Sequence, residues 1–217
     1  MDRGDCSIEG DGEMKWYLVP LFMIFLTSCF NPRVHRGDIL FRSATSDSLS
    51  SAINRVTGAV GYSHIGVVDT LHGKMVVIHA TPHGGVIKST LDEFSKEGGV
   101  ARRVDVFMIR KPKEIRINTA LRHANNLLGE KYNKTYIIED SGYYCSEFIY
   151  DIFKEDSLFQ LNPMTFKDPV SGTFNEGWVE YYKKLGIDIP EGKLGCNPNE
   201  MSKNCNLRYV FSYGESK

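Results

Sequence analysis

The chain has 217 residues, a length that suits one domain with a substantial hydrophobic core. Its hydrophobic content of 41% and charged content of 24% are those of an ordinary globular protein. The formal net charge of −1 lacks the basic excess of a nucleic-acid-binding surface, so we expect no nucleic-acid partner.

The first 28 residues have the features of a secretory signal. Lys15 precedes an apolar run that ends at Leu26; the run contains Pro20 and is shorter than the roughly 20 residues of a transmembrane helix. It closes on Leu26-Thr27-Ser28-Cys29, which resembles a bacterial lipobox with Cys29 as the lipidated first residue of the mature chain. The alternative is a buried core helix. We expect residues 1–13 to be an over-long start, with Met14 as the initiator.

This interpretation predicts the location and the domain organisation. Residues 29–35 would form a short tether, and residues 36–217 one globular domain held at the membrane through Cys29. No acidic residue follows Cys29 directly. By resemblance to lipoprotein sorting signals, this favours the outer membrane of a bacterial envelope, with the domain facing the periplasm.

The first half of the chain is predicted to be mainly strands. Thr90 and Glu93 match a capping box that opens a helical turn. Ser46 or Asp47 can cap another short helix that ends near Gly58. In chain order, the expected elements are a turn into a strand at 37–41, a helix at about 46–58, strands at 62–69 and 74–80, a helical turn at 91–94 and a strand at 104–110.

The second half is predicted to be mainly helices. Gly129 and Gly186 stand where two amphipathic patterns stop, as is typical of helix C-termini. The expected elements are helices at 115–128, from about 145 and at 175–185, and a strand at 207–213. Strands and helices are mixed without regular alternation, which predicts an α+β fold with a central antiparallel sheet or small barrel packed by helices.

Two histidines are predicted to meet on the 62–80 hairpin. A symmetric four-residue loop at 70–73 would place Asp69 opposite Lys74, and His64 opposite His79. Directly opposed residues share one face of the sheet, with Cβ atoms about 5 Å apart. One ring could then act as a base while the other orients it. A register shift of one residue would separate the two rings.

Cys145 is predicted to lie at a helix N-terminus, because Gly142 precedes it in a loop and an apolar periodic segment follows it. Unpaired N–H groups and the helix dipole favour a thiolate there and could bind an oxyanion. Tyr144 or Ser63 could supply a second donor or contact a substrate. Glu147 could reach the site, or be only an acidic residue of the first helical turn.

The remaining cysteines leave Cys145 without a partner. Cys196 and Cys205 are close in sequence and could form a disulfide in an oxidising compartment, or stay as two free thiols. A zinc site made of Cys145, His64 and His79 is conceivable, but the usual ligand spacings are missing. We therefore expect no metal and no cofactor.

Several segments together resemble the permuted NlpC-type papain-like cysteine hydrolases, and most closely their YiiX/YebB-like branch. The resemblance covers about residues 36–212 and implies that Cys145 is the nucleophile, His64 the base and His79 the third polar residue. That third residue is often glutamate in the YiiX-like branch, whereas histidine is closer to NlpC peptidases and lecithin–retinol acyltransferases. The segments, in chain order, are Gly37-Asp38-Ile39-Leu40-Phe41, Tyr62-Ser63-His64-Ile65-Gly66-Val67-Val68, Val77-Ile78-His79-Ala80 and Tyr143-Tyr144-Cys145-Ser146-Glu147-Phe148-Ile149-Tyr150.

Three functions follow from this interpretation. The first is hydrolysis of an amide bond through a thioester, with peptidoglycan stem peptides or their fragments as the expected substrate. The second is hydrolysis or transfer of a lipid acyl group, which the permuted order and the expected anchor favour. The third is a non-catalytic binding module on the same fold.

Overall fold

The computed structural model describes residues 33–44, 61–110 and 115–214. The predicted signal, Cys29 and the helix predicted at 46–58 lie outside these residues. No helix in the described part of the chain is long and apolar enough to cross a membrane.

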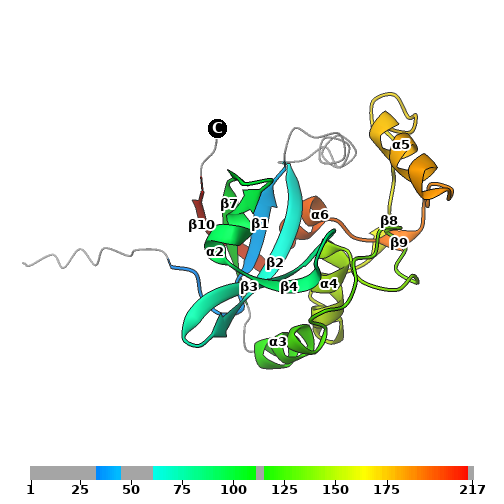
Figure 1. The fold of residues 1–217 in the computed structure, drawn as a ribbon. Coiled ribbons are helices and arrows are strands. Elements are labelled where there is room, and N and C mark those ends of the chain that lie inside the picture. Colours follow the sequence, from blue (N-terminus) through cyan, green and yellow to red (C-terminus); the bar gives the residue numbers. More distant parts are fainter. Residues whose placement is uncertain (1–32, 45–60, 111–114, 215–217) are drawn as a thin grey trace, which may run out of the picture. The chain divides into compact units, whose positions relative to one another are not determined.

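A six-stranded antiparallel sheet forms the centre of the fold, in the order β10-β7-β1-β2-β3-β4 (Figure 1). The strands predicted at 62–69, 74–80, 104–110 and 207–213 are confirmed, and the segment 37–41 is a turn that leads into a strand at Ile39–Ser43. The sheet strands are β1 (Ile39–Ser43), β2 (Tyr62–Leu71), β3 (Lys74–Thr81), β4 (Gly85–Thr90), β7 (Val104–Ile109) and β10 (Leu207–Tyr213). Two small two-stranded sheets pair β5 (Lys96–Glu97) with β6 (Val100–Ala101), and β8 (Asn162–Pro163) with β9 (Leu194–Gly195).

The predicted helices that fall on described residues are present. Thr90 caps α2 by accepting from the Glu93 N–H at 3.1 Å, as the capping box predicted. Gly186 ends α5 with a φ of 69°, the left-handed conformation that glycine adopts easily. The helices are α2 (Leu91–Ser95), α3 (Ile117–Asn126), α4 (Cys145–Phe153), the 3₁₀ turn η1 (Lys154–Asp156), α5 (Glu176–Leu185) and α6 (Pro198–Ser202).

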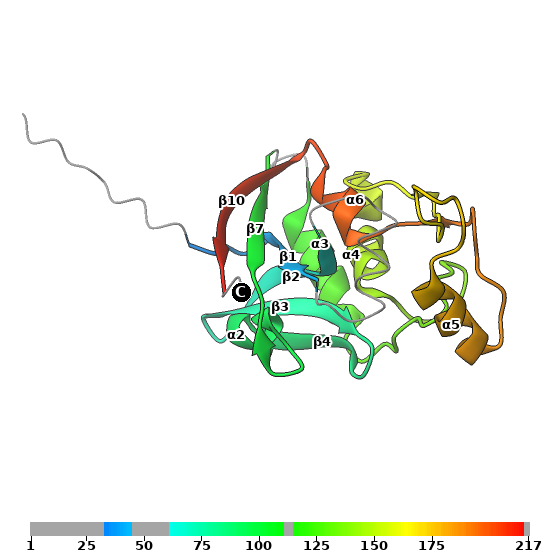
Figure 2. The ribbon, with the colours of Figure 1, turned by 90° about the horizontal axis from the view of Figure 1, so that it is seen from above.

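The two faces of the sheet are covered by different helices (Figures 1 and 2). Because side chains alternate along a strand, each strand contributes to two separate cores. Helices α3 and α4 pack on the face that carries Ile39, Phe41, Ile65, Val67 and Ile78. Phe94 of α2 packs on the opposite face, which carries Leu40, Val68, Val77, Val104 and Val106.

The β2–β3 hairpin is tighter than the sequence analysis predicted. Leu71 pairs with Lys74, so the loop has two residues, His72 and Gly73. Both have positive φ, 49° and 76°, as the favoured two-residue hairpin turn requires. The predicted pairing of Asp69 with Lys74 is wrong, because Asp69 lies opposite Val76.

The same two-residue shift means that His64 and His79 are not directly opposite one another. A shift of two residues moves a side chain along the strand but keeps it on its face, because the period of a strand is two. The prediction that the two histidines share a face is therefore confirmed, as their ring contact below shows.

Gly66 makes room for this arrangement. A Cβ atom at residue 66 would lie 2.5 Å from Val77 Cγ1, 3.0 Å from Phe94 Cε2 and 3.2 Å from His79 Cβ. The flanking strand and α2 can therefore pack closely against β2 only where the side chain is a hydrogen atom.

We predict that Gly66→Ala lowers the free energy of unfolding by about 1–3 kcal/mol, the usual cost of overpacking a core. Chemical denaturation measures this loss, with Thr70→Ala at an exposed position of the same strand as the control. Equal stability of the two variants would show that the sheet relaxes around residue 66 without cost.

Candidate active site

Helix α4 begins at Cys145, as predicted. Gly142 has a φ of 98°, and a Cβ atom there would lie 2.4 Å from the Lys131 carbonyl oxygen. The Tyr143 N–H donates to that same oxygen at 3.0 Å. Glycine thus lets the preceding loop pass close to residue 131 and deliver Cys145 to the first turn of the helix.

Buried polar groups fix this end of α4. Glu147 Oε2 accepts from the Tyr144 N–H and from Asn133 Nδ2, each at 3.1 Å. Ser146 Oγ donates to the Cys196 carbonyl oxygen at 3.0 Å, and the Cys196 N–H donates to the Tyr144 hydroxyl at 3.2 Å. The nucleophile candidate therefore stands on a helix terminus tied to two separate loops.

The sulfur of Cys145 lies against the backbone of β2. The thiol donates to the Ser63 carbonyl oxygen at 3.9 Å, and the N–H of Ile65 donates to the sulfur. These two residues flank His64. Strands β2 and β3 pair from Val67 and Ile78 onwards, so this stretch of β2 is beyond their shared ladder. We refer to the unpaired edge of β2 at residues 63–65 as the strand opening.

The strand opening matters because Cys145 and His64 come from different faces of the sheet. Helix α4 packs on the face of Ile65 and Val67, whereas His64 points to the face of Phe94, with ring centroids 5.5 Å apart. A thiol on one face can approach an imidazole on the other only where two strands separate.

A chain of hydrogen bonds joins three neighbouring strands. His64 Nε2 lies 2.7 Å from His79 Nδ1, and His79 Nε2 lies 2.9 Å from Ser89 Oγ. If His79 donates from Nε2 to Ser89, its Nδ1 is an acceptor, and His64 must then donate from Nε2. That set of tautomers leaves His64 Nδ1 without a proton, which is what a general base requires.

His64 Nδ1 has no hydrogen-bond partner among the described residues, and the thiol bonds to Ser63 rather than to this nitrogen. Such a pair is often long in an enzyme without substrate and shortens in the complex. The residues predicted for catalysis are thus gathered at one place, with the thiol against the backbone on both sides of His64.

Burial favours the uncharged forms of all three groups. It raises the pKa of the Cys145 thiol to about 11, although N–H groups of Ser146 and Ile65 act in the opposite direction. Burial and the positive charge of Arg42 lower the pKa of His79 to about 3 and hold the pKa of His64 well below 6.5. Desolvation thus acts against the thiolate that the helix terminus favours, and it is the larger of the two effects.

A β-bulge shapes this part of β2. Arg42 pairs with His64, but the next residue, Ser43, pairs with Tyr62, so Ser63 is the extra residue. Asn199 of α6 fixes the start of the strand by accepting from the Tyr62 N–H at 2.8 Å and donating to its carbonyl at 3.2 Å. Bulges of this kind re-aim side chains near functional sites.

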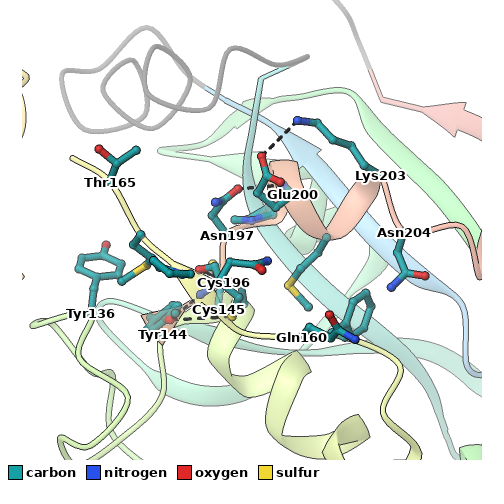
Figure 3. A pocket seen from close by; sticks show the side chains of 18 of the residues that line it. Tyr136, Tyr144, Cys145, Gln160, Thr165, Cys196, Asn197, Glu200, Lys203 and Asn204 are labelled. Carbon is teal, nitrogen blue, oxygen red and sulfur yellow. Dashed lines mark hydrogen bonds and ion pairs between the residues drawn. The ribbon is translucent and has the colours of Figure 1, made fainter. Parts of the chain in front are cut away.

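A cavity of about 590 Å³ opens beside Cys145. Figure 3 shows Cys145 between Tyr136 on one side and Asn204 on the other. The interior is largely aromatic and apolar, with a polar rim. Its apolar lining includes Tyr132, Tyr136, Tyr144, Leu158, Phe159, Met164, Phe166, Trp178 and Met201, and its rim includes Gln160, Asn197, Glu200, Lys203 and Asn204.

The predicted substrate contacts have different positions. Ser63 and Tyr144 line the cavity, and Ser63 Oγ is buried without a partner in the part of the chain that the structure describes. Glu147 is buried away from the cavity lining and caps α4. Of the two states left open for Cys196 and Cys205, the structure has free thiols, with Cys196 buried beside Tyr144 and Cys205 exposed.

Sequence reasoning missed several residues of the site. Ser89 belongs to β4, a strand that was not predicted because Gly84 and Gly85 precede only a short apolar pair. Most of the cavity comes from residues 157–166 and 195–206, which reach Cys145 only through the tertiary fold. No local pattern in these segments signals a binding site.

A family model described as "Permuted papain-like amidase enzyme, YaeF/YiiX, C92 family" matches residues 33–211. The chain belongs to this family. It is therefore a cysteine amidase with a permuted papain-like fold, which confirms the resemblance of its motifs. None of the curated proteins compared with this amidase matches it.

The fold of this amidase is similar to that of a solved structure described as "metalloprotein yiiX from Escherichia coli O157:H7". The TM-score is 0.66 at 22% identity, covering 82% of this chain and 97% of the other. Within residues 33–44, 61–110 and 115–214, no three His, Cys, Asp or Glu side chains group closely enough to hold a metal ion. His64 and His79 direct their facing nitrogens at each other, so this pair does not offer two ligands to one ion.

We predict that Ser89→Ala allows both tautomers of the histidine pair, because His79 Nε2 loses its hydrogen-bond partner. ¹⁵N spectra of the rings should show His64 Nε2 mostly protonated in the wild type and mixed tautomers in the variant. Alkylation of Cys145 at pH 7 should slow by about two- to tenfold, the effect of one hydrogen bond. Ser89→Thr, which keeps the hydroxyl, should restore both readouts; an unchanged Ser89→Ala variant would remove Ser89 from the site.

A second prediction concerns Glu147, whose pKa burial raises to about 7. The folded state holds this proton more tightly than the unfolded state, so stability is greatest below about pH 4.5 and falls as the pH rises through 7. Relative to Glu147→Gln, the wild type should lose at least about 1 kcal/mol between pH 4.5 and 8. Parallel pH profiles from chemical denaturation would contradict a buried, proton-binding Glu147.

Proposed function

We propose that this amidase hydrolyses its substrate through a thioester on Cys145, with His64 as general base and acid. His64 Nδ1 accepts the thiol proton while the sulfur attacks the carbonyl carbon. The C–N bond then breaks, and His64 returns the proton to the leaving amine. Water, deprotonated by His64, finally cleaves the thioester and releases the acid and the thiol.

The observation that carries this proposal is the position of the Cys145 sulfur. It lies at a helix N-terminus, at the edge of an open cavity, and against the backbone on both sides of a histidine. The first N–H groups of α4 have no carbonyl partner within the helix, so they can donate to the oxyanion of the tetrahedral intermediate. The neutral His64–His79–Ser89 chain supports proton acceptance at Nδ1.

Peptidoglycan stem peptides or their fragments are the first candidate substrate. The polar rim of the cavity favours a charged peptide, since Glu200 and Lys203 form an ion pair there at 3.1 Å, together with Asn197 and Asn204. An amide-cleaving family is also consistent with a peptide bond as the scissile group.

Acyl lipids are the second candidate, because the interior of the same cavity is apolar. Aromatic side chains such as Phe159, Phe166 and Trp178 and the flexible side chain of Met164 would suit a hydrocarbon chain better than a stem peptide. Transfer rather than hydrolysis would further require that water be excluded from the thioester.

We also propose that the enzyme is anchored in a bacterial envelope through Cys29. The support comes from the sequence: the short apolar run and the motif Leu26-Thr27-Ser28-Cys29. Such a tether would keep the domain near the membrane and close to either candidate substrate.

Thiol alkylation tests the catalytic assignment. In the full chain, iodoacetamide should modify Cys145 increasingly from pH 5 to 9, and His64→Ala should slow the reaction several-fold at pH 6–8, where the base assists proton removal. Peptide mass spectrometry follows Cys145 separately from the exposed Cys205, which is the internal control, and Cys145→Ala identifies the modified position. Equal rates with and without His64 would contradict its role as base.

The substrate class can be decided by comparing cleavage of the two candidate substrates. Stem-peptide fragments and fatty-acyl amides should each be incubated with the wild type and with Cys145→Ala, and the released amine measured. Trp178→Ala should reduce cleavage of the acyl amide by about tenfold or more if the aromatic interior binds the chain. Cleavage of peptides that is insensitive to Trp178 would favour the first candidate.

A further inference from the structure

Arg42 lies beside the two histidines on the same face of the sheet. It pairs with His64 across β1 and β2, which places the two Cβ atoms about 5 Å apart on one face. Its side chain is buried, with the residue only 8% exposed. A buried cation is therefore the direct neighbour of the proposed base.

The guanidinium is fixed by α2 and β5. Nη1 donates to the carbonyl oxygens of Phe94 at 3.1 Å and Lys96 at 3.0 Å, and Nη2 lies 3.3 Å from Glu97 Oε1. Arg42 Nε has no partner within the described residues. The Glu97 side chain is 32% exposed, so solvent weakens its charge and leaves a positive field around Arg42.

The ring of Phe94 lies close to all three groups. Its centroid is 5.8 Å from Arg42 Cζ, 5.5 Å from the His64 ring and 5.1 Å from the His79 ring. An aromatic ring supplies no hydrogen bond and no water, so the charge of Arg42 acts on the imidazoles through a medium of low polarity.

We propose that Arg42 is a positioning residue that holds the His64–His79 pair uncharged, so that His64 stays ready to accept a proton. This role rests on the proposed function of Cys145 and His64. Although burial lowers the pKa of Arg42, an arginine side chain keeps its proton at neutral pH, so Arg42 carries a positive charge there. That charge opposes a positive ring and attracts the thiolate that forms when Cys145 loses its proton.

The same field would also help the second half of the reaction. Once His64 has taken the thiol proton, a cation beside it makes the imidazolium a stronger acid. The proton then passes more readily to the nitrogen of the leaving amine, and His64 returns to its uncharged form. The effect on both rings is in the direction of a lower pKa, after burial, which is the larger cause.

Several other titratable or charged groups lie on the elements packed around the His64–His79 pair. Arg102 adds to the positive field at Arg42, and Glu97 opposes it. Asp92 of α2 binds Lys96, and Glu93 binds Thr90. From α4, Cys145 is uncharged at rest.

The test is a titration of the histidine rings by NMR in the full chain labelled with ¹³C and ¹⁵N histidine. Spectra of His64→Gln and His79→Gln assign the two buried rings among the six histidines. In the wild type, both should stay uncharged down to pH 4. Arg42→Met should raise their midpoints by about one pH unit, a tenfold change in proton affinity, whereas Arg42→Lys should stay near the wild type.

The variant Glu97→Gln distinguishes an effect of the Arg42 charge from an effect of the contacts that Arg42 makes with α2 and β5. Removing the carboxylate leaves Arg42 less compensated, so the midpoints should fall or stay at the wild-type value. If Arg42 acted only by holding α2 against the sheet, both Arg42→Met and Glu97→Gln would weaken that contact. Water would then reach the His64 and His79 rings, and their titration midpoints would rise in both variants.

Two outcomes overturn the proposal: unchanged midpoints in Arg42→Met, which would mean that burial suffices, or a rise in Glu97→Gln. If Arg42→Met does not fold, Glu97→Gln decides by the same criterion. The titration uses no substrate and can be repeated in Cys145→Ala. If Cys145 is not the nucleophile, the alkylation test will show it. The ring titration would still report whether Arg42 keeps the two histidines uncharged.

Discussion

The separation of β2 from β3 is the constraint on which the site depends. Their ladder ends at Val67 and Ile78, and beyond it β2 pairs only with β1. The exposed backbone edge receives the Cys145 sulfur, which contacts the Ser63 carbonyl and the Ile65 N–H. A continuous sheet would keep a thiol from α4 and an imidazole on the α2 face apart. Three features help to bring the Cys145 thiol and the His64 imidazole together at the strand opening. They are the bulge at Ser63, the hydrogen bonds between Asn199 and Tyr62, and the glycine at residue 142.

The environment of the site favours a neutral resting pair over a thiolate and an imidazolium. Cys145 is 6% exposed, and both histidines are buried. Charge separation in such a place is costly unless it is stabilised by fixed groups. The N–H groups of α4 and Ile65, and the field of Arg42, are oriented to stabilise the negative charge when it forms. The His79–Ser89 end of the chain is neutral, so it orients His64 without stabilising a positive ring as a carboxylate would.

Much of the architecture could be predicted from the sequence because it is local. The capping box at Thr90 and Glu93, the glycine stop at residue 186 and the helix start at Cys145 are short-range signals, and the structure confirms them. The hairpin register was wrong by two residues because the segment 70–73 contains two possible turn lengths. His72 adopts a left-handed φ, which could not be predicted from its residue type alone. The histidine pair was still placed on one face, since an even shift preserves the alternation of a strand.

What the sequence could not reveal depends on the tertiary fold. The helix terminus at Cys145 suggested a thiolate, whereas the surroundings that desolvate it come from β2 and from the loop around Cys196. Ser89 and Arg42 lie 10 residues beyond His79 and 22 residues before His64 in the chain, and only strand pairing brings them to the pair. The proximity of Cys196 and Cys205 in sequence suggested a disulfide, but Cys196 faces Tyr144 instead.

The most direct measurement asks whether the side chains of residues 64 and 145 meet through the strand opening. A thiol introduced by His64→Cys should form a disulfide with Cys145 under mild oxidation with diamide, because the Cys145 sulfur lies against the backbone on both sides of residue 64. Mass spectrometry of non-reduced peptides should detect this link, and Thr70→Cys on the same strand should form none. Failure of His64→Cys to link, in a protein that remains folded, would contradict the account of a site assembled across the two faces of the sheet.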